Sequence, residues 1–255
     1  MEKSATEPIF RVRGLHKSYG AKTVLSDLDF EVLRGESLVI LGRSGSGKSV
    51  TLRQLNGLEK PDSGSIRFED QEISELSERD LYPLRKRVAM LFQGGALFDS
   101  MTVFENVAFP LREHTGLDED EIAATVRHKL AMVRLEGIES KLPADLSGGM
   151  KKRVALARSM ALDPEVVLFD EPTTGLDPMT SATIAQLIRA SQRQLRSTSV
   201  VVTHDLSLAR VVGNRIAFLS EGRFSFVGTW DEAERAPDPL LADFLAGREG
   251  TEDDA

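Results

Sequence analysis

The stretch "LVILGRSGSGKS" at residues 38–49 decides the fold. Its second part, residues 42–49, matches the pattern G-x-x-x-x-G-K-[ST], with an apolar strand-like run before it and a helical segment after it. In this context the glycines let the backbone wrap closely around an anion, and the helix start adds partial positive charge. A glycine-rich turn with an incidental lysine is the alternative, and the flanking strand and helix argue against it. We therefore expect a phosphate-binding loop in an α/β domain.

Two side chains of this loop have the chemistry for a nucleoside triphosphate. Lys48 supplies a full positive charge for the β- and γ-phosphates, and the Ser49 hydroxyl can ligate Mg²⁺. A nucleotide also needs a partner for its base, and Tyr19 in "HKSYG" could stack on a purine ring. Taken alone, Tyr19 is equally well explained as a core or surface aromatic residue.

Residues 166–171, "VVLFDE", form an apolar run that ends in two carboxylates. Ligands of open α/β sheets bind at the carboxyl ends of strands, so Asp170 is placed to hold Mg²⁺, directly or through water. Glu171 lies one residue later, points differently, and is placed to polarise an attacking water. Without a phosphate loop in the same chain, solvated charges at a strand end would be the better interpretation.

Two further polar residues follow short apolar runs. His204 ends "VVVTH" and is one of only four histidines, so we interpret it as a γ-phosphate contact or a residue that orients water. Gln93 ends "VAMLFQ", is neutral, and can touch both metal and water. A structural histidine and a capping glutamine are the alternatives for these two positions.

A second anion site is predicted at "LSGGM", residues 146–150. Ser147 is a good N-cap residue, and Gly148 and Gly149 expose backbone N–H groups at a helix start. The basic residues 151–153 come after this start, at the wrong end to grip an anion, so we interpret them mainly as a solvated helix face.

Composition limits the class of protein. The 255 residues are 41% hydrophobic and 28% charged, as in a globular protein with a real core, and the formal net charge is −8. A chain this acidic is unsuited to nucleic acid. It has no cysteine, no secretory signal, and no apolar stretch near the ~20 residues that cross a bilayer. We expect a cytoplasmic chain that another protein holds at the membrane if it works there.

The apolar pattern changes along the chain. Strand-like runs dominate to about residue 70, and residues 92–163 have helical character, with Ile122, Val126, Leu130 and Val133 on one helix face. From Val166 two apolar runs flank the helical segment 180–195, which predicts a βαβ unit and a parallel sheet.

Taken in order, these motifs resemble one family. "GRSGSGKS", Gln93, "LSGGM", "VVLFDEP", "GLDP" (175–178) and "VVTHD" occur in the order of an ABC-type ATPase, over about residues 10–228. The resemblance implies a homodimer in which "LSGG" of one copy covers the ATP on the other copy's phosphate loop. Met150 departs from the commoner glutamine, and this change removes a hydrogen-bond donor.

The resemblance also assigns residues and boundaries. ATP contacts would come from Tyr19, Gly42, Arg43, Ser44, Gly45, Ser46, Gly47, Lys48, Ser49, Val50, Ser147, Gly148, Gly149 and Asp177. Catalytic roles would fall to Glu171, His204, Gln93 and Lys48, and Mg²⁺ ligation to Ser49, Gln93 and Asp170. The implied fold is an α/β P-loop NTPase with a RecA-like mixed sheet, an N-terminal antiparallel β subdomain and a helical insert. One domain would span 9–247, with 9–91 and 164–228 as β subdomain and core, 92–163 helical, 229–247 as C-terminal helices, and a frayed acidic tail at 248–255.

Residues 90–117 together with "LSGGM" are similar to the ATPase subunits of Mla/Mce phospholipid transport systems. The similarity implies an MlaE-type permease, an MCE-domain protein and a position at the cytoplasmic face of the inner membrane, with phospholipid moved between inner and outer membranes. Relatives with a longer C-terminus hold a STAS-domain small subunit, and the short acidic end here puts that partner in question. The alternatives are another importer ATPase, for example for polar amino acids, a soluble regulatory ATPase, and a nucleotide-binding module without turnover.

Overall fold

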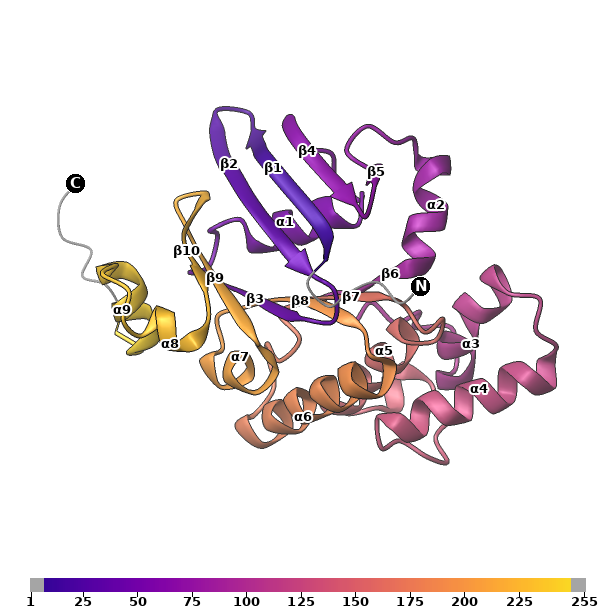
Figure 1. The fold of residues 1–255 in the computed structure, drawn as a ribbon. Helices are drawn as coiled ribbons and strands as arrows, with labels where there is room; N and C mark the ends of the chain where they lie inside the picture. The colour runs from indigo at the N-terminus through magenta and orange to yellow at the C-terminus, as the bar shows by residue number, and fades with distance from the viewer. Residues whose placement is uncertain (1–6, 249–255) are drawn as a thin grey trace. The chain divides into compact units, whose positions relative to one another are not determined.

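The computed structural model describes residues 7–248, so the predicted tail beyond Arg248 lies outside the described residues. The chain forms two compact units, of which the first comprises Met1–Ser77 and Val200–Ala255 and the second comprises Glu78–Ser199. Both units contain strands and helices (Figure 1), and the first unit has an antiparallel sheet of its own. The expectation of an α/β fold with a mixed sheet and an antiparallel β subdomain is confirmed.

The antiparallel sheet of the first unit has the strand order β2-β1-β4-β5. Its strands are β1 (Pro8–Tyr19), β2 (Lys22–Leu33), β4 (Ser63–Phe68) and β5 (Gln71–Glu72). Phe10 of β1 is fully buried opposite Phe68 of β4, with 5.1 Å between the ring centroids. Alternate residues of β2 are buried from Leu28 to Val32, as the sequence pattern predicts for a strand with one apolar face, whereas β1 buries Ile9, Phe10, Val12 and Leu15.

The phosphate loop leaves a different sheet of the same unit. The neighbouring strands of this sheet are, in order, β10 (Arg223–Gly228), β9 (Arg215–Ser220), β3 (Ser37–Leu41) and β8 (Thr198–Thr203). Strands β3 and β9 are parallel. All five residues of β3 are buried, which is typical of a strand covered on both faces. The helices of this unit are α1 (Lys48–Leu55), α7 (Leu206–Val212), α8 (Trp230–Ala233) and α9 (Pro239–Leu245).

The second unit combines a parallel strand pair with most of the helices. Its strands are β6 (Val88–Leu91) and β7 (Val166–Asp170), and its helices are α2 (Glu78–Arg87), α3 (Val103–His114), α4 (Glu119–Met132), α5 (Gly148–Ser159) and α6 (Pro178–Leu195). A short 3₁₀ helix covers Pro143–Asp145. The predicted helical subdomain, residues 92–163, lies inside this unit, and its boundaries as a subdomain stay a prediction.

Helix α4 shows how the sequence sets an element. The four apolar residues predicted to share one face are all buried, with Ile122 2% exposed and Val126, Leu130 and Val133 fully inaccessible. Asp118 is the N-cap, and its side chain accepts a hydrogen bond from the backbone N–H of Glu121, which closes a capping box. Within residues 7–248, no helix is long and apolar enough to cross a membrane.

Candidate functional site

The phosphate loop joins the end of β3 to the start of α1. Gly47 caps α1 with a left-handed backbone (φ 105°), and an added Cβ atom would lie 2.7 Å from Leu25 Cδ2 and 3.0 Å from the carbonyl oxygen of Val24. Only glycine fits both the backbone angle and this space. In a phosphate-binding loop, a close turn of this kind lets backbone N–H groups and the start of the following helix face one anion.

Lys48 lies inside the loop rather than out in solvent. Its side chain is 6% exposed, and Nζ donates hydrogen bonds to the carbonyl oxygens of Gly42 (2.8 Å) and Arg43 (2.9 Å). The hydroxyl oxygen of Ser46 is buried and has no hydrogen-bond partner among the described residues. A phosphate oxygen would give that hydroxyl an acceptor. Arg43, Ser44 and Gly45 are exposed, Ser49 is half-buried and Val50 is buried.

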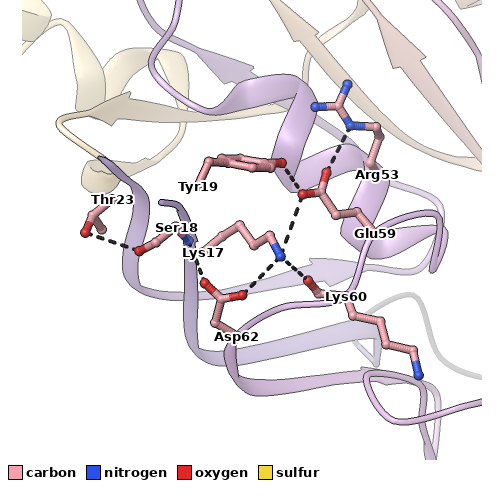
Figure 2. A network of polar contacts seen from close by, with 8 residues as sticks. All are labelled: Lys17, Ser18, Tyr19, Thr23, Arg53, Glu59, Lys60 and Asp62. Atoms are coloured by element: carbon pink, nitrogen blue, oxygen red, sulfur yellow. Dashed lines mark hydrogen bonds and ion pairs between the residues drawn. The ribbon is translucent and has the colours of Figure 1, made fainter. Parts of the chain in front are cut away.

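His204 and Tyr19 belong to the same unit as the loop. His204 is exposed and follows β8, the strand that neighbours β3 in the sheet. Tyr19 ends β1 and is 47% exposed. Figure 2 shows its hydroxyl directed at Glu59, and the Nζ atom of Lys17 lies 5.5 Å from the ring centroid. Both residues therefore keep an accessible side chain, as a ligand contact requires.

The second unit brings Gln93 to the same edge as the two carboxylates. Strands β6 and β7 are parallel, and Leu91 pairs with Phe169, so Gln93 and Glu171 each lie two residues beyond a matched pair. Asp170 is 6% exposed and Glu171 is 8% exposed. Glu171 has a left-handed backbone (φ 45°), and its carboxylate accepts a hydrogen bond from the Thr174 hydroxyl at 3.3 Å. Such a conformation is costly for a residue other than glycine, and strained residues of this kind cluster at active sites.

The interpretation of residues 151–153 as a solvated face is wrong for Lys152. Its side chain is 8% exposed, and Nζ donates a hydrogen bond to the backbone oxygen of Gln93. Burial lowers the pKa of Lys152, whereas the charges of Asp170 and Glu171 act to raise it. The helical period contains the signal for this, because Ala155 and Leu156, three and four residues later, are also buried.

The start of α5 matches the expected N-cap and adds a steric constraint. The Ser147 hydroxyl accepts a hydrogen bond from the backbone N–H of Met150 at 3.3 Å. A Cβ atom on Gly149 would lie only 2.5 Å from Cγ2 of Thr180. Thr180 in turn donates to the carboxylate of Asp177 through its backbone N–H (3.0 Å) and its hydroxyl (2.5 Å). The hydroxyl and then the N–H of Thr180 hold the pKa of Asp177 below its usual value.

The predicted Mg²⁺ ligands have suitable chemistry. The hydroxyl, amide and carboxylate oxygens of Ser49, Gln93 and Asp170 are hard ligands of the kind that Mg²⁺ prefers. Within residues 7–248, no group of three His, Cys, Asp or Glu side chains could hold a metal ion by itself.

The predicted site residues thus fall into two sets. The phosphate loop, Tyr19 and His204 belong to the first unit. The other set, in the second unit, comprises Gln93, Ser147, Gly148, Gly149, Asp170, Glu171 and Asp177. Thr180 and Lys152 join members of the second set and are not predicted from the sequence. The chemical roles assigned to both sets stay predictions.

Comparison with known proteins identifies the family models and relatives that this chain matches. A model described as ABC transporter matches residues 25–174, and an AAA domain model matches residues 140–210. A protein named "Probable ribonucleotide transport ATP-binding protein mkl" from Mycobacterium leprae is 43% identical over 93% of this chain and 68% of its own length. Versions from other mycobacteria match over 66% of their length, so the chain spans about two thirds of these relatives.

Other relatives match over nearly their whole length. Intermembrane phospholipid transport system ATP-binding proteins MlaF from Haemophilus influenzae and Escherichia coli are each 39% identical, over 94% and 97% of this chain and 90% and 91% of their own length. Among solved structures, cbiO1 from Clostridium perfringens, part of the ABC transporter complex cbiONQ, has a TM-score of 0.82 at 32% identity, over 93% and 95% of the two chains. A dimeric ATP-binding cassette bound to ADP and Pi has a TM-score of 0.79 at 31% identity, over 86% and 98%.

Proposed function

The chain belongs to the ABC transporter family of ATP-binding proteins, and on this premise we propose that it is the ATPase subunit that powers phospholipid transport between membranes. The observation that carries the proposal is the similarity to the two MlaF proteins over nearly the whole length of both chains. The working form is a homodimer, as in the solved cassette with ADP and Pi. A membrane permease of the MlaE type, attached to an MCE-domain protein, receives the mechanical work and holds the ATPase at the inner membrane.

The names of the relatives give two cargoes, phospholipid and ribonucleotide. The alignment covers 91% of the Escherichia coli MlaF protein but only 68% of the mkl protein, and this difference favours phospholipid. The relatives above give no support to a polar amino-acid importer. A STAS-domain small subunit remains a further proposed partner.

Residues 90–117 are proposed to face the permease. Phe98 and Phe109 are 41% and 37% exposed, and their ring centroids lie 5.1 Å apart. Val103, in the same segment, is fully buried and belongs to the core instead. An exposed aromatic pair in the loop and helix that follow Gln93 can relay the nucleotide state to a partner.

The chemistry follows from the placed groups. ATP binds to the phosphate loop through backbone N–H groups and Lys48, and Mg²⁺, held by Ser49, Gln93 and Asp170, would neutralise charge on the phosphates. Glu171 takes a proton from the attacking water, and His204 orients that water against the γ-phosphate. Ser147 and the glycines of a second copy close over the same nucleotide and stabilise the charge that spreads in the transition state.

Hydrolysis then separates the copies. ADP and phosphate leave like charges in one interface, so the closed dimer loses its ligand-linked stabilisation and opens. The free-energy difference between the closed and open states is the work delivered to the permease.

The decisive variant is Glu171→Gln. It keeps the shape of the side chain and removes the base, so we expect ATP-dependent dimerisation to persist while turnover falls about 100-fold or more. Lys48→Ala is the comparison variant, because it removes the charge that binds the phosphates of ATP. It should abolish both dimerisation and turnover. Purification from detergent-solubilised membranes, with identification of co-purified proteins and lipid, tests the transport assignment. Turnover of Glu171→Gln at the wild-type rate, or a partner without a permease, would contradict the proposal.

A further inference from the structure

Glu59 connects the tyrosine at the end of β1 to the helix that leaves the phosphate loop. It follows α1, and its side chain is 18% exposed. The hydroxyl of Tyr19 donates to Oε1 of Glu59, and Nε of Arg53, on α1, donates to Oε2 at 3.3 Å. Figure 2 shows the side chains of Tyr19 and Arg53 both directed at the Glu59 carboxylate.

Lys17 lies beside the same ring in a fixed position. Its Nζ atom donates to Oδ1 of Asp62 at 3.0 Å and to the carbonyl oxygen of Lys60 at 2.9 Å, and it lies 3.8 Å from Oε1 of Glu59. Asp62 also accepts a hydrogen bond from the backbone N–H of Ser18 at 2.6 Å. Only 15% of the Lys17 side chain is exposed, so this cation is held by the fold rather than by solvent.

These contacts restrict the Tyr19 ring at both of its ends. The backbone is fixed in β1, and the hydroxyl is fixed by Glu59, so rotation about the two side-chain bonds is lost before any ligand arrives. Burial and then the bond to Glu59 raise the pKa of Tyr19, which keeps the hydroxyl protonated as a donor. Tyr19 as a residue is still 47% exposed, which leaves room for a planar base beside it.

We propose that Glu59 is a positioning residue for the nucleotide base: it holds the Tyr19 ring in the orientation in which a purine stacks on it, and ties that orientation to α1 through Arg53. This inference rests on the proposed function, because it needs a nucleotide at the phosphate loop. A ring that is oriented in advance loses less conformational entropy when the base binds. Glu59 therefore contributes to base affinity without touching the base or the phosphates.

The competing explanation is that Glu59 supports the end of α1, and with it the phosphate loop. The two explanations differ in which part of the ligand loses affinity. Inorganic tripolyphosphate has the phosphates of ATP and no base, so it reports on the loop alone. A positioning role predicts weaker binding of MgATP with unchanged binding of tripolyphosphate, and a supporting role predicts that both weaken.

Both ligands would be titrated calorimetrically onto the full chain and its Glu59→Ala, Tyr19→Phe and doubly substituted variants. We expect each single substitution to raise the Kd for MgATP about threefold to tenfold, because the ring remains but must be ordered when the base binds, and ordering one side chain costs roughly this much. Tripolyphosphate should bind all variants within about twofold of wild type. The double variant should bind MgATP no more weakly than either single variant, because both remove the same contact.

Glu31→Ala is the control, since it breaks a comparable ion pair with Arg13 elsewhere in the first unit, and it should leave both Kd values unchanged. Tyr19→Phe keeps an exposed ring and removes one hydroxyl, so it preserves the test if Glu59→Ala fails to fold. Additive losses in the double variant, equal losses for both ligands, or no loss for MgATP would each overturn the inference. If the wild-type chain bound neither ligand, the proposed function itself would fail, and the inference would fall with it.

Discussion

The Nζ atom of Lys152, on α5, donates a hydrogen bond to the backbone oxygen of Gln93, just beyond β6. The helix that begins at the "LSGG" segment is thereby joined to the loop that follows a central strand. Burial lowers the pKa of Lys152, and the charges of Asp170 and Glu171 oppose part of that shift. One buried ammonium thus links the loop of Gln93 to the strand end that carries the predicted base.

We expect Lys152→Met to lower kcat about 10- to 100-fold at saturating ATP, because small displacements of positioned groups have costs of this size. The methionine fills the same volume and cannot donate to Gln93 or offset the two carboxylates. Lys152→Arg should recover part of the rate, since it restores a charged donor. The measurement is steady-state ATP hydrolysis at saturating substrate, with the melting temperature recorded in parallel.

Lys151→Met is the matched control, because it makes the same chemical change one residue earlier, at a half-buried position. It should hydrolyse ATP at close to the wild-type rate. If Lys152→Met did the same while folding normally, the contact with Gln93 would be structural only.

Lys152 also shows where sequence reasoning stops. A phosphate loop, an apolar strand that ends in "DE" and a serine before two glycines are local patterns with local physical causes, and each lies where the sequence predicts. The burial of a lysine is different, because it depends on what covers the helix. Its charge favours solvent, and only the helical spacing to Ala155 and Leu156 indicates the buried face.

Helix α2 is not predicted for a similar reason. Only Leu81 and Leu84 of its ten residues are buried, which is too few to give a clear period, and Pro83 lies inside it. Glu59 lies in a loop and has no motif around it, so its contact with Tyr19 becomes visible only when β1 and α1 are placed in one unit. The spacing of residues in the sequence does not predict contacts between residues that are far apart in the chain.

Gly149 is required by packing as well as by any ligand. We expect Gly149→Ala to lower the free energy of unfolding by about 1–3 kcal/mol, because its methyl group would overlap Cγ2 of Thr180. Thr180→Ser removes that methyl group and keeps the hydroxyl that donates to Asp177. The double variant should therefore regain the stability of the wild type. Urea unfolding of the single and double variants measures both effects.

Thr180→Ser alone serves as the control and should unfold within about 0.5 kcal/mol of the wild type, as most mild substitutions do. A double variant as unstable as Gly149→Ala would mean that the overlap with Thr180 is not the cause. If stability returned and ATP turnover did not, the same result would separate the packing role of Gly149 from its predicted contact with ATP.

Glu105 gives a prediction for pH. Helix α3 begins with a capping box in which the Glu105 carboxylate accepts hydrogen bonds from the backbone N–H (2.7 Å) and the hydroxyl (2.9 Å) of Thr102. The N–H and then the hydroxyl hold the pKa of Glu105 below the ordinary value for a glutamate. Because the folded-state pKa is lowered, this contribution to stability is present above the unfolded pKa and is lost as the pH falls through the folded pKa.

Glu105→Gln keeps an oxygen acceptor for the cap and removes the charge that titrates. We expect the variant to be less stable than the wild type at neutral pH, and the difference to shrink as the pH is lowered to about 3. Urea unfolding across this range measures the difference directly. Glu113→Gln makes the same change near the end of the same helix, where a negative charge is unfavourable, and should cause no loss at neutral pH. A difference between wild type and Glu105→Gln that stayed constant into acid would show that the carboxylate charge does not stabilise the start of α3.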